Sequence, residues 1–366
     1  MKAIAITPGK GDARLIDIEE PSVKNDKDVK LQVLEVGICG TDREEIVGGR
    51  ADAPSGSSEL VIGHEMLGRV VETGKGVTKI KKGDYAMLMV RRPCNHCPFC
   101  LNNRSDMCSS GDYTERGIKG IHGYQTEFVV DHENFVIPVA EEIRDIGVLT
   151  EPLSVVIKAV DEALMLQSCR FSGIVPDLIK GKRALVAGLG PIGLLAALVL
   201  KLKGADIYGL DIVKPASVRP SIFSEIGGHY INGLELKTEN IDNTYGPMDF
   251  IFEATGIAKL EFELMDALAV NGVYVLAGIP AGERPVTILG ADLMRKMVLK
   301  NQVMLGSVNA SYDHYIKASE ELVRFKNTFS SPVSKLITER VNYRDFRNVL
   351  ELHSSDEIKA IVEWSR

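Results

Sequence analysis

Four cysteines lie close together within one stretch of fifteen residues: Cys94, Cys97, Cys100 and Cys108. Their spacing supplies four thiolates, which are enough to close a tetrahedral shell around zinc and leave no position for water. We therefore predict a structural zinc site that ties down a long loop, with His96 outside the shell and in contact with solvent. An iron–sulfur cluster is the main alternative, because its thiolates can have similar spacings. Disulfides are a less favoured alternative.

A second set of residues has the chemistry of a catalytic metal site. Cys39 and His64 offer a thiolate and an imidazole, and a carboxylate could come from Glu65, from Glu151, or from both in turn. One Cys, one His and one carboxylate leave an open position on zinc for a substrate oxygen. Zinc there would polarise the hydroxyl oxygen of an alcohol substrate, so that the carbon bearing this oxygen could release a hydride to a nicotinamide. Thr41 would pass the proton of that hydroxyl toward solvent. Taken singly, Cys39 could be a buried apolar group, His64 a structural residue and Thr41 a turn hydroxyl.

A glycine-rich turn in the second half of the chain matches the pattern G-x-G-x-x-G. It consists of Gly188, Leu189, Gly190, Pro191, Ile192 and Gly193. An apolar strand over residues 184–187 precedes the turn, and an apolar helix over residues 192–203 follows it. Gly188 would permit the tight turn, Gly190 would let the backbone approach a pyrophosphate, and Gly193 would allow close helix–strand packing. The pattern predicts a dinucleotide site at a helix N-terminus. The alternative is an ordinary strand–helix turn that binds nothing.

An acidic residue, Asp211, lies eighteen residues after Gly193, at the end of the next predicted strand. A carboxylate there accepts hydrogen bonds from the ribose hydroxyls of adenosine and repels a 2′-phosphate. Because Ile212 follows Asp211 where an NADP site would usually place arginine, NAD is favoured. Lys214 could weaken that preference, so NADP stays open as a second cofactor. Asp211 could also merely cap a helix.

The elements that must position these residues change in character near residue 153. Short apolar runs bounded by glycine or charge indicate a largely β region in the first 150 residues. These runs include residues 30–36, 68–73 and 85–90. From Leu153, apolar residues recur at helical spacing, and beyond Gly181 predicted strands alternate with helices. The predicted strands cover residues 184–187, 207–210, 250–254 and 273–277. The alternation predicts an α/β fold with a doubly wound parallel sheet.

The composition limits the partners that the protein could have. The 366 residues include 43 Lys and Arg against 50 Asp and Glu, so the formal net charge is −7. That length predicts two domains, or one domain with a large insertion. A mildly acidic chain without a long basic run is a poor candidate for binding nucleic acid or an anionic membrane. The longest uncharged apolar stretch, residues 184–200, is interrupted by glycine and proline, which disfavours a membrane span. The apolar run after Lys2 is too short to be a signal peptide, so we expect a cytoplasmic protein.

Together these motifs resemble the zinc-containing medium-chain dehydrogenase/reductase superfamily over nearly the whole chain. The shared features, in chain order, are Gly63-His64-Glu65, the four-cysteine loop, Glu151-Pro152 and the glycine-rich turn. Within the superfamily, the chain is most similar to the archaeal-type glucose 1-dehydrogenase branch. The features shared with that branch are residues 37–44, Arg91-Arg92, residues 111–123 and residues 306–309.

This resemblance implies a particular architecture and set of contacts. A mainly β, GroES-like catalytic domain would cover residues 1–152, with residues 306–366 returning to it, and a Rossmann domain would cover residues 153–305. Substrate contacts would come from Thr41, Glu115, Glu151 and Asn309. Cofactor contacts would extend beyond the glycine-rich turn and Asp211 to Ile212, Ala277 and Asn309. The resemblance also implies a homotetramer with a catalytic and a structural zinc ion in each chain.

The activity that the resemblance implies is oxidation of an aldose, D-glucose or D-galactose, at its anomeric hydroxyl to the lactone, with hydride transfer to NAD(P). Three departures from the family pattern bear on this expectation. Asp211-Ile212 replaces the Asn-Arg typical of NADP-accepting members, Val155 replaces an acidic residue that some members present to the sugar, and residues 214–220 after Asp211 are atypical and could reshape the adenosine pocket. Glu44 stands where alcohol dehydrogenases often have a histidine, as it does in the sugar branch, which implies a different proton exit path. Alternatives are a polyol, secondary-alcohol or L-threonine dehydrogenase on the same scaffold and, more remotely, a non-catalytic nucleotide-binding protein.

Overall fold

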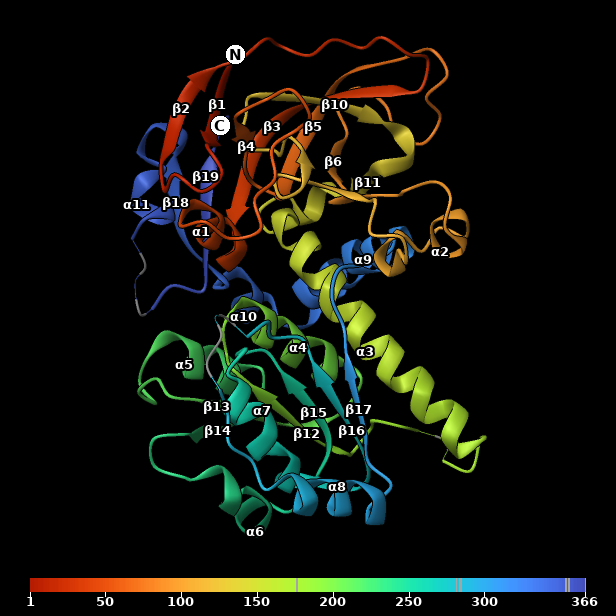
Figure 1. Ribbon diagram of the computed structural model, residues 1–366, viewed down its shortest axis with the longest axis vertical. Helices are drawn as coiled ribbons and strands as arrows, with labels where there is room; N and C mark the ends of the chain where they lie inside the picture. Colours follow the sequence, from red (N-terminus) through yellow and green to blue (C-terminus); the bar gives the residue numbers. More distant parts are fainter. Residues whose placement is uncertain (176, 281, 283–284, 353, 355, 366) are drawn as a thin grey trace. The chain divides into compact units, whose positions relative to one another are not determined.

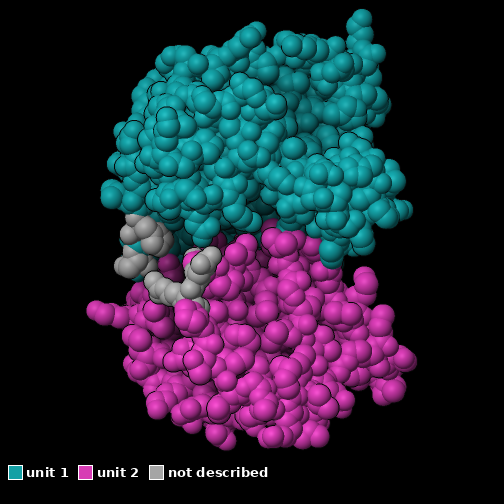
Figure 2. All heavy atoms as spheres, viewed as in Figure 1, with its two compact units in different colours: residues 1–154, 309–366 teal, residues 155–308 magenta. Residues whose placement is uncertain are grey.

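The chain divides into two compact units in the computed structural model, which describes residues 1–175, 177–280, 282, 285–352, 354 and 356–365. Unit 1 comprises Met1–Ser154 and Asn309–Arg366, and unit 2 comprises Val155–Val308 (Figure 2). In the structure the units divide after residues 154 and 308, whereas the sequence led us to expect boundaries two and three residues earlier, after residues 152 and 305. Unit 1 is therefore discontinuous in sequence, and its second segment is the last part of the chain.

The main sheet of unit 1 has seven strands in the order β11-β6-β5-β3-β19-β18, with β10 also paired to β3 (Figure 1). The strands are β3 (Asp28–Ile38), β5 (Glu65–Thr73), β6 (Tyr85–Leu88), β10 (Phe128–His132), β11 (Val136–Val139), β18 (Ile337–Asn342) and β19 (Lys359–Glu363). All these pairs are antiparallel except β18 with β19. The long strand β3 pairs with β5 on one side and β19 on the other, so it joins the two segments of unit 1. Four of its apolar side chains, those of Val29, Leu31, Val33 and Val36, are fully buried in the core of the unit.

The described part of unit 1 also contains two smaller sheets and several α-helices. The first sheet orders β2 (Ala13–Asp17), β1 (Lys2–Ile6) and β4 (Leu60–Val61), and the second orders β7 (Arg91–Arg92), β8 (Thr114–Arg116) and β9 (Gly120–Ile121). The helices are α1 (Gly40–Ile46), α2 (Pro98–Leu101), α9 (Tyr312–Thr328), α10 (Ser330–Ser334) and α11 (Arg347–Leu350). Helix α1 begins directly after β3, which fixes the place of any side chain at that junction.

Unit 2 contains a six-stranded, wholly parallel sheet in the order β14-β13-β12-β15-β16-β17 (Figure 1). The strands are β12 (Arg183–Ala187), β13 (Asp206–Asp211), β14 (His229–Asn232), β15 (Met248–Glu253), β16 (Leu268–Leu276) and β17 (Val303–Gly306). Strand β12, the first strand of unit 2 in the sequence, lies in the middle of the sheet. The next strands, β13 and β14, extend the sheet on one side of it, and β15, β16 and β17 extend it on the other, so the strand order reverses between β12 and β15. In open sheets of this kind, ligands bind beyond the carboxyl ends of the strands at that reversal.

Helices connect the parallel strands of unit 2. They are α4 (Pro191–Leu202), α5 (Val218–Glu225), α6 (Ile241–Tyr245), α7 (Ala258–Glu263) and α8 (Gly290–Leu299), and α3 (Thr150–Phe171) leads into the unit. Strand β12 is apolar and buried from Ala184 onward, as expected of a strand covered on both faces. None of the helices in the described ranges has both the length and the hydropathy of a membrane span.

Strand β16 begins five residues earlier than the sequence predicted. The predicted strand started at Val273, directly after Asn271-Gly272, a pair that is typical of turns. In the structure the strand continues through these residues: Asn271 adopts a left-handed backbone (φ 62°), and the pairing with β15 shifts its register between Met248 and Phe250. Asn271 and Gly272 therefore form an irregularity within the strand instead of a turn that ends it.

Candidate active site

Three side chains of unit 1 bring metal-ligating atoms together: those of Cys39, His64 and Glu65 lie within 4.8 Å of one another. Cys39 follows β3, while His64 and Glu65 stand at the beginning of β5. Because Gly37 of β3 is paired with Glu65 of β5, the strand register places the end of one strand beside the start of the other. A thiolate, an imidazole and a carboxylate are donors that zinc accepts, and three of them leave a fourth position open. The donor set therefore fits a catalytic zinc ion.

A fully buried carboxylate, Asp42, holds two of these donors in place. The backbone N–H of Cys39 donates to Asp42 Oδ2 at 2.8 Å, and His64 Nδ1 lies 3.3 Å from Asp42 Oδ1. Burial raises the pKa of Asp42, but His64 and the Cys39 amide outweigh it and hold that pKa below its usual value. With Nδ1 facing a carboxylate, His64 keeps Nε2 for a metal, which is the usual arrangement around a metal-ligating histidine. Asp42 was not among the functional residues expected from the sequence, although its place three residues after Cys39 at a helix start was a signal.

The two carboxylates that could serve the metal differ in their surroundings. Both oxygens of Glu65 accept hydrogen bonds from Lys359 Nζ, at 2.7 and 2.6 Å. Glu151, at the start of α3, lies outside the group of three donors and accepts a long 3.5 Å bond from the Tyr315 hydroxyl. Burial raises the pKa of Glu151 to about 7. The structure thus places Glu65 with Cys39 and leaves Glu151 as a separate buried acid.

Two residues expected to contact a sugar meet in unit 1, although 194 positions separate them: Asn309 Nδ2 donates to Glu115 Oε1 at 2.7 Å. The same oxygen accepts Arg91 Nε at 3.0 Å and faces Arg91 Nη2 at 2.9 Å. The Arg91 guanidinium in turn lies over the ring of Tyr113, 3.8 Å from its centroid. The carboxylate of Glu115 is therefore fixed in direction. Thr41 lies half-buried in the first turn of α1.

The four cysteines of the loop also come together, with their sulfur atoms within 4.8 Å of one another. The backbone N–H groups of Cys97 and Cys100 donate to the sulfurs of Cys94 and Cys97, each at 3.4 Å. The bond from Cys100 is the main cause that lowers the pKa of Cys97 to about 5. None of the cysteines forms a disulfide. Four thiolates in this geometry fit a closed tetrahedral zinc shell, and His96 is exposed outside it.

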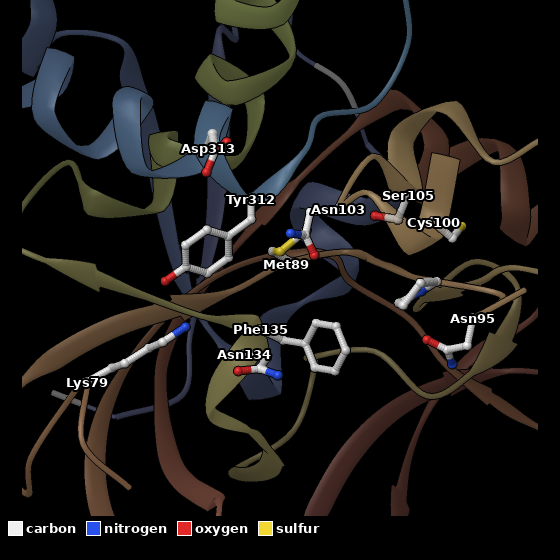
Figure 3. Close-up of a pocket in the computed structure, with 11 residues that line it drawn as sticks. Lys79, Met89, Asn95, Cys100, Asn103, Ser105, Asn134, Phe135, Tyr312 and Asp313 are labelled. Carbon is white, nitrogen blue, oxygen red and sulfur yellow. The ribbon is translucent and has the colours of Figure 1, made fainter. Parts of the chain in front are cut away.

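A cavity of about 430 Å³ adjoins the cysteine loop (Figure 3). Its lining is formed by Lys79, Met89, Pro93, Asn95, Cys100, Asn103, Ser105, Asn134, Phe135, Tyr312 and Asp313. None of the expected sugar contacts is among these residues. The cavity is therefore distinct from the candidate catalytic site.

The glycine-rich turn of unit 2 has the geometry that its pattern predicts. Gly188 has a left-handed backbone (φ 86°), and a Cβ on Gly193 would lie 1.8 Å from the carbonyl oxygen of Gly188. A Cβ on Gly190 would meet nothing within 4 Å, so the space over this residue is open. Helix α4 begins at Pro191, and its first amides face the turn. This turn fits the pyrophosphate of a dinucleotide.

The remaining cofactor candidates of unit 2 stand at the carboxyl ends of the parallel strands. Asp211 ends β13, and its Oδ2 accepts the N–H of Leu189 at 2.9 Å while its Oδ1 accepts the N–H of Ile212 at 2.7 Å. The side chain of Ile212 is 63% exposed. Ala277 follows β16 at the same edge of the sheet. Asn309, expected to contact both sugar and cofactor, belongs to unit 1, where its amide is bonded to Glu115.

The parallel sheet with its glycine-rich turn, and the metal-donor groups of the mainly β unit, define a zinc-dependent dehydrogenase that uses a nicotinamide dinucleotide. Comparison with known proteins agrees. Residues 25–141 match the alcohol dehydrogenase GroES-like domain, and residues 144–364 match the glucose dehydrogenase C-terminus. The chain is 36% identical over 365 residues to a glucose 1-dehydrogenase of Methanocella arvoryzae and 37% identical over 366 residues to one of Thermoproteus tenax, with 99% of each chain covered.

A solved structure shows the same similarity in three dimensions. The Haloferax mediterranei glucose dehydrogenase, in a complex with NADP, Zn and gluconolactone, superimposes with a TM-score of 0.90 at 31% identity, and all of both chains is covered. This protein belongs to the zinc-containing medium-chain dehydrogenase/reductase superfamily, in its archaeal-type glucose 1-dehydrogenase branch. The family and fold class predicted from the sequence are confirmed.

Proposed function

We propose that this protein oxidises D-glucose at its anomeric hydroxyl to the lactone and transfers the hydride to NAD, with D-galactose as a second sugar and NADP as a second cofactor. The observation that carries the proposal is the group formed by Cys39, His64 and Glu65 in a chain that shares 36% identity with a glucose 1-dehydrogenase. The Haloferax relative, which was solved with gluconolactone, supports a sugar lactone as the product.

The side chains around the metal site have separate tasks in this reaction. Cys39, His64 and Glu65 would hold a zinc ion, which when bound supplies Lewis-acid polarisation of the anomeric oxygen. Asp42 keeps the His64 ring and the Cys39 backbone in position. Thr41, two residues after Cys39, would take the proton of the anomeric hydroxyl and pass it toward solvent.

Recognition of the sugar would depend on Glu115 and Asn309. Glu115 Oε1 receives bonds from Arg91 and Asn309, whereas Oε2 accepts none from the part of the chain that the structure describes. A carboxylate held by a guanidinium and an amide presents its second oxygen in a fixed direction, which suits a sugar hydroxyl. Substitution of Glu115 should therefore weaken sugar binding more than it slows hydride transfer.

The cofactor would bind to unit 2. The glycine-rich turn and the N-terminus of α4 would hold the pyrophosphate, with Gly190 as the point of closest approach. The carboxylate of Asp211 would accept the ribose hydroxyls of adenosine, which favours NAD over NADP. The homotetramer and the cytoplasmic location expected from the sequence remain predictions.

The decisive experiment measures initial rates of nicotinamide reduction with D-glucose, with NAD and NADP in parallel, followed by D-galactose, polyols, secondary alcohols and L-threonine. Turnover of glucose with a preference for NAD is expected, and Glu115→Gln should raise KM for glucose by about tenfold or more. Substitution of Glu72, an exposed carboxylate on β5, serves as the matched control and should leave KM unchanged. Activity on a polyol or L-threonine but on no sugar would contradict the proposal, and an unchanged KM in Glu115→Gln would remove this residue from the sugar site.

A further inference from the structure

Arg219 lies beside the carboxylate of Asp211, which is expected to select the cofactor. No motif in the sequence indicated a role for this arginine. It is the second residue of α5, eight positions after Asp211. Its Nη1 lies 3.7 Å from Asp211 Oδ2, and the side chains are 17% and 9% exposed. Two charges at this distance with little solvent between them interact more strongly than an exposed surface pair. Helix α5 packs against β14, the neighbour of β13 in the sheet, and this packing rather than a local motif brings Arg219 to Asp211.

Asp211 cannot easily turn away from its partner, because both of its oxygens accept backbone N–H groups. Oδ2 is bonded to Leu189 in the glycine-rich turn, and Oδ1 is bonded to Ile212. The backbone of Asp211 is fixed as well, because the Tyr230 hydroxyl donates to the carbonyl oxygens of Asp211 and Val213. The carboxylate is therefore a fixed anion at the edge of the turn, with a guanidinium beside it.

We propose that Arg219 is a specificity-determining residue that lets this site accept the 2′-phosphate of NADP as well as the ribose hydroxyls of NAD. The inference rests on the proposed dinucleotide site of unit 2 and refines its cofactor range. An uncompensated Asp211 would repel a 2′-phosphate, but the charge of Arg219 offsets that of the carboxylate. The guanidinium also has several donors in a planar fork, which match the oxygens of a phosphate.

The same pair explains how one site could serve both cofactors. With NAD, the carboxylate of Asp211 would accept the ribose hydroxyls while Arg219 stays beside Oδ2. With NADP, the 2′-phosphate competes with Asp211 for the guanidinium, so part of the binding free energy is spent on separating the existing pair. NADP should therefore bind, but more weakly than it would at a site without Asp211.

The test uses the two adenosine fragments that differ only in the 2′-phosphate, namely 5′-AMP and 2′,5′-ADP. Their dissociation constants are measured by calorimetry on the full-length protein and its variants. Because neither a sugar nor the catalytic metal takes part, the result is independent of the substrate assignment. Arg219→Gln should weaken 2′,5′-ADP by about tenfold. The affinity for 5′-AMP should stay within about twofold.

Three further variants separate charge recognition from a structural role. Arg219→Lys keeps the charge and should recover part of the affinity for 2′,5′-ADP, whereas Asp211→Asn removes the competing anion and should tighten 2′,5′-ADP. Lys237→Gln, at a cation of unit 2 that is 80% exposed, is the control and should change the ratio little. The inference is overturned if Arg219→Gln weakens both fragments equally or leaves their ratio unchanged. If the unaltered protein binds neither fragment, both this inference and the proposed dinucleotide site are overturned; if it binds 5′-AMP but not 2′,5′-ADP, only this inference is overturned.

Discussion

The ammonium group of Lys359 lies 2.6 Å from Oε2 of Glu65, and the two side chains are each only 2% exposed. Lys359 belongs to β19 and Glu65 to β5, the two strands that flank β3. Gly37 of β3 stands between them, and a Cβ there would lie 2.2 Å from Glu65 Oε2. A glycine is therefore needed for the carboxylate to reach the lysine. Burial lowers the pKa of Lys359, but the charge of Glu65 outweighs it and the pKa is raised.

Breaking this pair should destabilise the protein. In protein prepared without zinc, Lys359→Met leaves the carboxylate of Glu65 buried without any counter-charge, which typically costs about 3–5 kcal/mol of unfolding free energy. The double variant Lys359→Met with Glu65→Gln removes both charges and should recover part of that loss. Urea unfolding of the single and double variants measures the coupling. A Lys359→Met protein as stable as the unaltered one would show that the pair contributes nothing.

The catalytic metal site should be separable from the stability of the fold. Cys39→Ala removes a half-buried ligand that is not part of the apolar core, so turnover should be lost while the melting temperature changes little. Metal analysis should show one zinc ion fewer in each chain. Cys169→Ala, at an exposed cysteine outside both metal groups, is the control. Full activity in Cys39→Ala would refute the catalytic assignment.

The four-cysteine loop should behave in the opposite way. Its residues have little apolar core of their own, and a closed zinc shell would supply much of the free energy that orders them. Cys108→Ser should therefore lower both the zinc content and the melting temperature. An unchanged melting temperature with unchanged zinc would argue against a structural site, and iron in the purified protein would favour the iron–sulfur alternative.

Acid should weaken unit 1 through Glu133, a carboxylate that is 4% exposed. Its oxygens accept Lys27 Nζ at 2.6 Å and the backbone N–H of Thr78 at 2.8 Å, which lower its pKa to about 2. Since the folded pKa lies below the ordinary value of about 4.3, these bonds stabilise the fold above that pH and lose their effect as the pH falls toward 2.

The corresponding variant is Glu133→Gln, which keeps the shape of the side chain and removes its charge. It should lower the unfolding free energy at pH 7 by about 1–3 kcal/mol. The difference from the unaltered protein should shrink as the pH falls from 4 to 2. Chemical denaturation at several pH values measures this, with Glu72→Gln as the exposed control. A difference that is constant with pH would assign the effect to packing rather than to charge.

Residues that act within short segments were determined by the sequence. The cysteine loop is identified by spacing alone, because its four ligands stand within fifteen positions and come from one loop. The glycine-rich turn is identified in the same way, since its strand, turn and helix are consecutive in the chain. Alternating strands and helices likewise predicted the parallel sheet of unit 2, because a parallel connection needs a crossover. In each case the chemistry depends on local backbone geometry.

The partners of these residues were decided by the tertiary structure. Lys359 reaches Glu65 across 294 positions because β19 pairs with β3, and Asn309 reaches Glu115 because the last segment of the chain returns to unit 1. Arg219 faces Asp211 because α5 packs against β14, the strand beside β13. No periodicity or spacing encodes such pairs, since they follow from strand register and helix packing. The sequence by itself determined which groups could do chemistry, and the packing of distant segments decided which charges those groups meet.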